Sequence, residues 1–116
     1  YRDIDGDGRQ AEEEVLDWAD FVVTMDYSDD AEQLIENVDE LVEYANMQGE
    51  RILVGVETGS PSCFDHPWPQ ETFHDEDVNT MEKEISQVVN EFRDDSSFAG
   101  IGIHYYGSYR DLPVER

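Results

Sequence analysis

Three short apolar runs alternate with long amphipathic stretches, and this alternation constrains the fold of the chain more than any other feature. The runs 21–25, 51–56 and 98–103 are almost uninterrupted, which is typical of buried strands in parallel sheets. The stretches 28–49 and 75–94 carry apolar residues at helical spacing, and a shorter helix is predicted over 9–19. Strands that alternate with helices pair in parallel. The predicted fold class is therefore α/β, in the order α-β-α-β-α-β, with one unit over 1–116.

The predicted helices have recognisable ends and inner faces. Ser28, Asp29 and Asp30 are residue types that begin helices, and Gly49 suits a left-handed cap. The first helix is expected to bury an apolar side made of Ala11, Val15, Leu16, Trp18 and Ala19. The inner face of the third helix is predicted to hold Val78, Met81, Ile85, Val88, Val89 and Phe92.

Three parallel strands complete neither a barrel nor an open α/β sheet, although the spacing of the βα units fits both. A sheet that is apolar on both faces would leave its edges and one face uncovered. We therefore expect the neighbouring strands to come from a longer chain or from a second copy. The chain begins at Tyr1 rather than at methionine, which leaves a processed product and a fragment both open.

Acidic residues dominate the composition: thirty Asp and Glu against seven Lys and Arg give a formal net charge of -23. Such a surface is expected where salt screens it, in a halophile's cytoplasm or outside the cell. The alternative is an acidic protein that binds a cationic partner. Without a basic patch, neither nucleic acid nor an anionic membrane is an expected partner.

The single cysteine, Cys63, excludes an internal disulfide framework.

Polar residues follow each predicted strand at its carboxyl end, which is where ligands bind in parallel α/β folds. Asp26 follows the first run, Glu57 the second and His104 the third. Two carboxylates that flank a scissile bond are the usual equipment for glycoside hydrolysis, so Asp26 and Glu57 are candidate catalytic residues. Alternatively, these side chains only cap helices or face solvent.

Aromatic residues gather near the same end of the predicted sheet. Trp68 lies in the loop 58–74, and its indole suits stacking on a sugar. The alternative is that aromatic residues of this loop pack it against the core, which we favour for Phe64 and Phe73. Both interpretations stay open for Trp68.

The sequence VVTMDYSD, then a helix, ILVGVETG, a loop and helix, and FAGIGIHYYGSYRDL resembles the last three strands of a (β/α)8 glycoside-hydrolase-like barrel. The resemblance covers about residues 10–112 and implies a partial TIM barrel, strands six to eight. It implies that Glu57 is the nucleophile on strand seven. Asp26 and Tyr27, in a Met-x-Tyr strand like that of chitinase-like barrels, would contact the sugar. His104 and Tyr105 would line the substrate cleft.

One part of such an enzyme is missing from the chain. The general acid of these barrels comes from strand four, which this sequence does not contain. Retaining hydrolysis needs that second carboxyl about 5 to 5.5 Å from the nucleophile. We therefore expect the chain to be inactive by itself.

An acidic segment near the start of the chain fits the spacing of an EF-hand calcium loop. Asp3, Asp5, Asp7 and Glu14 could supply oxygen ligands to Ca²⁺, with Gly8 at the sharp turn. Against this, no entering helix precedes Asp3. The alternative is a solvated acidic turn.

The leading expectation is the C-terminal portion of a carbohydrate-active barrel protein adapted to high salt, with a carbohydrate or another small molecule as substrate. The alternative is a non-catalytic α/β binding or interaction module that self-associates, and a calcium-dependent structural module is a third interpretation. The first requires a missing half-barrel, and the second a homo-oligomer.

Overall fold

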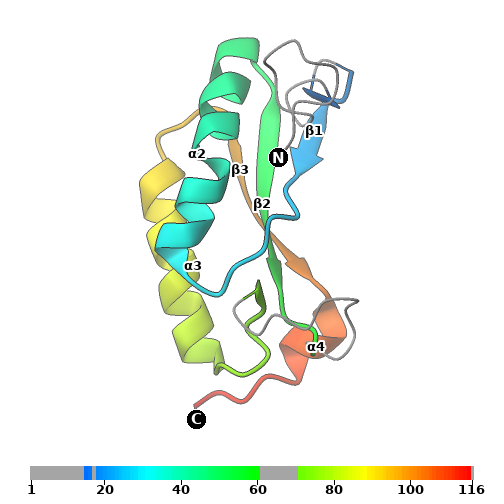
Figure 1. Ribbon diagram of the computed structural model, residues 1–116, viewed down its shortest axis with the longest axis vertical. Coiled ribbons are helices and arrows are strands. Elements are labelled where there is room, and N and C mark those ends of the chain that lie inside the picture. Colours follow the sequence, from blue (N-terminus) through cyan, green and yellow to red (C-terminus); the bar gives the residue numbers. More distant parts are fainter. Residues whose placement is uncertain (1–14, 17, 61–70, 116) are drawn as a thin grey trace.

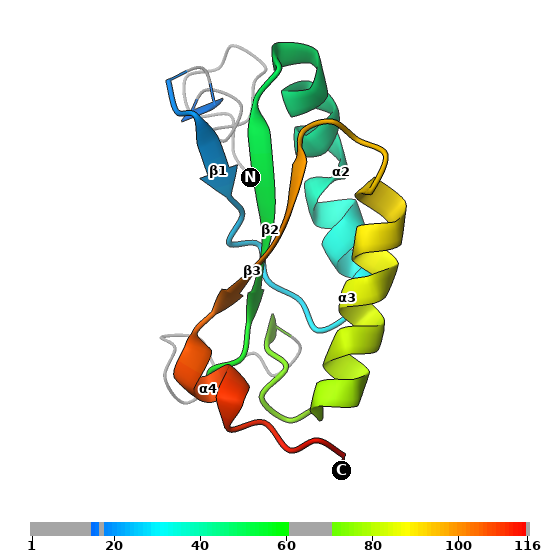
Figure 2. The ribbon, with the colours of Figure 1, turned by 180° about the vertical axis from the view of Figure 1, so that it is seen from behind.

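A computed structural model describes residues 15, 16, 18–60 and 71–115. Its elements, in chain order, are β1 (Phe21–Val23), α2 (Ala31–Gln48), β2 (Arg51–Glu57), α3 (Val78–Phe92), β3 (Phe98–His104) and α4 (Tyr106–Arg110). β2 lies in the middle of the sheet and pairs in parallel with β1 and with β3 (Figures 1 and 2). The predicted α/β class, with parallel strands and alternating helices, is confirmed.

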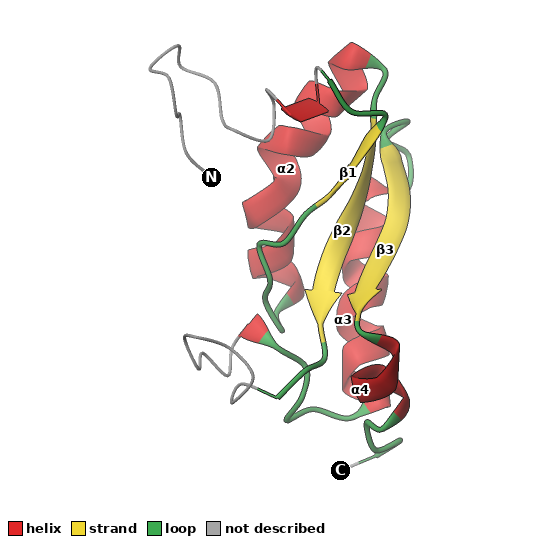
Figure 3. Ribbon diagram, turned by 90° about the vertical axis from the view of Figure 1, so that its right-hand side faces the viewer, coloured by secondary structure: helices red, strands yellow, loops and turns green. Residues whose placement is uncertain are grey.

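Both long helices cover the same face of the sheet, and in Figure 3 they lie behind the three strands. Ile52, Val54 and Val56 of β2 point toward the helices and are fully buried there. Side chains alternate along a strand, so Leu53, Gly55 and Glu57 belong to the opposite face. We call this opposite face of β1, β2 and β3 the open face. The main core thus lies between the helices and one side of the sheet.

Local signals explain where the helices begin and end. The Asp30 side chain caps α2 by accepting a hydrogen bond from Gln33 N at 3.3 Å, and Gly49 ends the helix at φ 73°, as predicted. α3 is shorter than the predicted 75–94, because Asp77 is its N-cap and accepts from Thr80 N at 2.7 Å. No helix among the described residues is long and apolar enough to cross a membrane.

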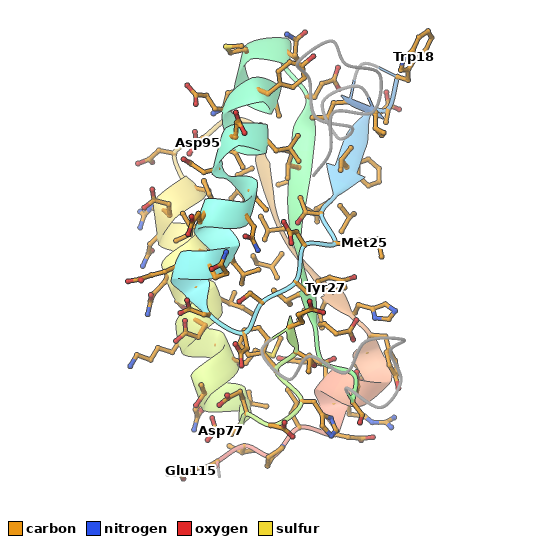
Figure 4. All side chains as sticks on the ribbon, in the orientation of Figure 1. Trp18, Met25, Tyr27, Asp77, Asp95 and Glu115 are labelled. Atoms are coloured by element: carbon orange, nitrogen blue, oxygen red, sulfur yellow. The ribbon has the colours of Figure 1, made fainter. Side chains whose placement is uncertain are left out.

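The sequence overestimated how much of the first strand and of the preceding helix is buried. β1 ends at Val23 instead of residue 25, and Phe21 and Val23 are 55% and 45% exposed. β1 is an edge strand whose open face has no cover within the described residues, so its apolar side chains stay in solvent. Trp18 is 92% exposed and points away from the protein in Figure 4, whereas Leu16 is buried. Of the predicted helix 9–19, residues 9–14 and 17 lie outside the described residues.

Acidic groups gather where the start of α2 meets α3. Burial is the largest cause that raises the pKa of Asp29, and the charges of Glu76, Asp30 and Glu84 raise it further. When folding raises the pKa of an acid, the native state binds more protons between the unfolded and the folded pKa. Stability therefore falls as the pH rises through that window, and the whole penalty is present at neutral pH.

We expect Asp29→Asn to raise the free energy of unfolding at pH 7 by up to about 0.5 kcal/mol, allowing for solvent screening at this partly exposed position. The gain should shrink as the pH falls toward the ordinary range of aspartate. Molar salt should remove the Coulombic part and leave the part due to burial. Thermal melts across pH and salt measure this, with the exposed Asp39→Asn of α2 as control. Equal shifts for both variants would contradict the expectation.

Candidate functional site

Glu57 is the last residue of the central strand, and its side chain is almost completely buried. Its Oε1 accepts hydrogen bonds from Gly59 N at 2.8 Å and from Thr58 N at 3.1 Å. Its Oε2 lies 2.7 Å from His104 Nδ1. Both carboxylate oxygens are therefore held in place, which compensates for the cost of removing this charge from water.

The returning end of the long loop fixes the backbone of Glu57. Phe73 N donates to Glu57 O at 2.9 Å. The Thr72 hydroxyl is 2.7 Å from Gly59 O and 3.2 Å from Glu57 O. Phe73 itself is fully buried, in agreement with the expectation that it packs the loop against the core. The carboxylate is thus positioned by strand pairing on one side and by this returning segment on the other.

Thr58 joins the end of β2 to the end of β3. Its N–H donates to His104 O at 2.7 Å, and its hydroxyl is 3.0 Å from the same carbonyl and 2.6 Å from Ser108 Oγ. The His104–Tyr105 peptide bond is cis. The hydrogen bonds of Thr58 keep the ends of the two strands in register, with Glu57 directly opposite His104.

Tyr27, on the segment that follows β1, lies close enough to Glu57 for the carboxylate charge to affect its phenol. Partial burial is the main cause that raises the pKa of Tyr27, and the charge of Glu57 adds to it. The phenol therefore keeps its proton at neutral pH and can donate a hydrogen bond. In Figure 4, Tyr27 and Met25 lie on the segment that follows β1.

A groove of about 320 Å³ on the open face leads to these residues. Its lining is mainly apolar or glycine and consists of Val23, Met25, Tyr27, Gly55, Gly102, Ile103 and His104. Gly55 and Gly102 are register partners. Each lies two residues before Glu57 or His104 on its strand, and therefore on the same face of the sheet. Gly102 leaves space in the groove, since an added Cβ there would meet only Val23 Cγ1, at 3.4 Å. At Gly55 the backbone oxygen of Thr24 already occupies the place that a side chain would take.

Tyr105 borders a different hollow, although the sequence placed it beside His104 in a single cleft. Its ring meets the His104 ring edge-on, with 5.4 Å between the centroids, and it is 50% exposed. This hollow of about 420 Å³ lies beside α4 and is lined by Ser60, His74, Tyr105, Gly107, Ser108, Arg110, Asp111, Leu112 and Pro113. Tyr105 thus stands between the two depressions.

Asp26 is not joined to the other candidate residues. Its backbone carbonyl accepts a hydrogen bond from Asn37 Nδ2 at 3.3 Å, which ties the segment to α2. Within residues 15, 16, 18–60 and 71–115, no contact links its carboxylate to Glu57 or His104.

Trp68 and the calcium-like residues Asp3, Asp5, Asp7 and Glu14 lie outside the described residues. Across the described part of the chain, no group of His, Cys, Asp and Glu is arranged to hold a metal ion.

The sequence analysis missed the groups that hold Glu57 in place. Thr58 and Gly59 act through their backbone amides, and a Cβ added at Gly59 would lie 2.9 Å from Glu57 Oε1. The available signal was a glycine two residues after a carboxylate at a strand end, where close backbone approach calls for glycine. Thr72 left no local signal, because it acts from the far end of the loop.

Comparison of the chain with protein-family models, with curated proteins and with solved structures gives no match.

Proposed function

We propose that this chain supplies strands six to eight of a (β/α)8 barrel. In such a barrel the helices form an outer ring and the inner sheet face is filled by side chains. The arrangement of α2 and α3 on one face supports the proposal, as do the apolar side chains of Phe21, Val23 and Leu53 on the open face. β1 and β3 each pair on one side only within the described residues, so both edges are open to further strands.

We propose that the complete barrel is carbohydrate-active and that Glu57 is its nucleophile. The observation that carries this is the placement of Glu57: a buried carboxylate at the carboxyl end of the central strand, on the face that would line the barrel. In a retaining glycosidase this carboxylate bonds to the anomeric carbon as the leaving group takes a proton from the general acid. Water then breaks the glycosyl–enzyme bond, and the same acid residue, now a base, takes its proton.

The general acid has to come from the rest of the barrel. Such an acid stands about 5 to 5.5 Å from the nucleophile. The only hydrogen bond described for Asp26 goes to its backbone carbonyl, and none places its carboxylate beside Glu57. The chain alone is therefore proposed to be inactive, and the working protein to operate in high salt. The acidic outer side of α2, with Glu32, Glu36 and Glu43 exposed, supports that environment.

The test is to express the whole reading frame and assay it in molar KCl against a panel of aryl glycosides. We expect hydrolysis of at least one glycoside with retention at the anomeric carbon, which NMR of the first product shows directly. We expect the isolated chain to release no aglycone. Absence of turnover by a folded full product across the panel would overturn the proposal.

A self-associating module is the second candidate, because Phe21 and Val23 of the open face are exposed, as is Met25 on the segment that follows β1. Contiguous apolar surface of this kind marks an interaction site. Sedimentation in molar salt separates the two candidates. A stable dimer of the 116-residue chain favours the module, whereas a full-length monomer favours the barrel.

A further inference from the structure

Glu57 determines which nitrogen of His104 carries the proton. The two residues are register partners on the open face, with 2.7 Å between Oε2 and Nδ1. An ionised carboxylate only accepts hydrogen bonds, and Oε1 already accepts from two backbone amides. Nδ1 of His104 must therefore be the donor. In a neutral imidazole this leaves Nε2 without a proton, as an acceptor.

The two partners differ sharply in their access to solvent. The side chain of His104 is 62% exposed, whereas that of Glu57 is 2% exposed. His104 also lines the groove of the open face, and Glu57 does not. A ligand in this groove meets the imidazole before it meets the carboxylate. The imidazole, like the Tyr27 phenol, is consequently a polar group that this groove offers to a ligand, and its bare Nε2 is a hydrogen-bond acceptor.

We propose that Glu57 orients His104 and that Nε2 of His104 accepts a hydrogen bond from a hydroxyl group of the ligand in the groove. The ligand class is therefore a polyhydroxylated molecule with an apolar ring face, and assigning it to a sugar rests on the proposed function. The hydroxyl meets the acceptor Nε2, and the phenol of Tyr27 is available as a donor. Gly102, which lines the groove and whose added Cβ would meet only Val23 Cγ1 at 3.4 Å, leaves room for the ring.

The direct test is long-range ¹H–¹⁵N NMR of the histidine side chains in the folded chain at neutral pH. We expect His104 in the Nδ1–H form with a bare Nε2. Glu57→Gln should abolish this preference, because the carboxamide can also donate. Glu43→Gln, an exposed change on α2, should leave it unchanged. An Nε2–H form in the wild-type chain would overturn the proposal whatever the enzyme does.

The ligand contact is tested in the same spectra with methyl glycosides as probes. Their addition should shift the Nε2 resonance of His104, and their fully O-methylated counterparts, which lack hydroxyl donors, should not. No shift with any free glycoside, or equal shifts with the O-methylated set, would overturn the contact. These measurements need no turnover. If Glu57 and His104 behave as described but the full-length protein is inactive, only the glycosidase assignment is refuted.

Discussion

Replacing Glu57 by glutamine is expected to lower kcat of the full-length protein by on the order of 10⁴-fold or more, the scale seen when an enzyme loses its nucleophile. Glutamine has the same shape and keeps an oxygen for the amides of Thr58 and Gly59, but it cannot form a glycosyl ester. The lost charge also weakens the bond to His104. We expect a cost of about 1–2 kcal/mol in the free energy of unfolding, which leaves the protein folded.

Steady-state kinetics on a substrate of the wild-type protein measure this effect, with circular dichroism as the check on folding. Glu43→Gln makes the same chemical change on the exposed side of α2 and should leave kcat unchanged. If the Glu57 variant proves too unstable, mass spectrometry of the wild-type protein after treatment with a 2-fluoro glycoside identifies the esterified residue. Turnover retained in a folded Glu57→Gln protein, or an ester at another residue, would make Glu57 a structural carboxylate.

The order from β1 to β3 was predictable because each of these elements depends on local patterns, whereas α4 was not predicted. The periodic apolar residues and the caps Asp30 and Gly49 correctly placed α2. β2 was also correctly placed, extended by one residue to Glu57. Burial of β1 was not predictable in the same way, since an apolar run does not reveal whether its strand has a neighbour on each side. Phe21 is apolar and yet exposed for that reason.

The candidate site divides along the same line. Glu57 and His104 could be predicted, because strand ends in a parallel sheet meet at one edge. The same reasoning failed to separate Asp26 from Tyr27, since adjacent residues point in different directions and β1 has already ended at Val23. Thr72 reaches Glu57 from fifteen residues away through tertiary structure, which no local pattern encodes.

Gly55→Ala should be the most damaging small substitution in the chain. A Cβ at this position would lie 2.0 Å from the backbone oxygen of Thr24 and 3.2 Å from the Tyr27 ring. A backbone atom cannot rotate away as a side chain can, so β1 and β2 would have to separate. That movement would break the bonds from Gly55 N to Thr24 Oγ1, at 3.0 Å, and from Thr24 N to Leu53 O, at 2.9 Å.

We expect Gly55→Ala to cost about 3 kcal/mol or more, the upper end for overpacked sites, and to lower Tm by about 10 °C or more. Gly102→Ala is the matched control: it faces Gly55 across the strand pair, and its added Cβ would meet only Val23 Cγ1, at 3.4 Å. Alanine there should be neutral to mildly stabilising, because its Cβ makes only an ordinary contact and the loss of unfolded-state entropy stabilises by about 0.4–1 kcal/mol.

The two glycines also separate packing from function. Gly55→Ala displaces the segment on which Tyr27 lies, so it should lower stability and, in the proposed enzyme, also abolish glycoside turnover. Gly102→Ala leaves that segment in place and only narrows the groove beside Val23, so in the proposed enzyme it should raise KM while Tm stays the same or rises slightly. Similar melting temperatures for both variants would mean that the Thr24 backbone does not lie against Gly55. The position of Tyr27 near the Glu57 carboxylate would then be contradicted as well.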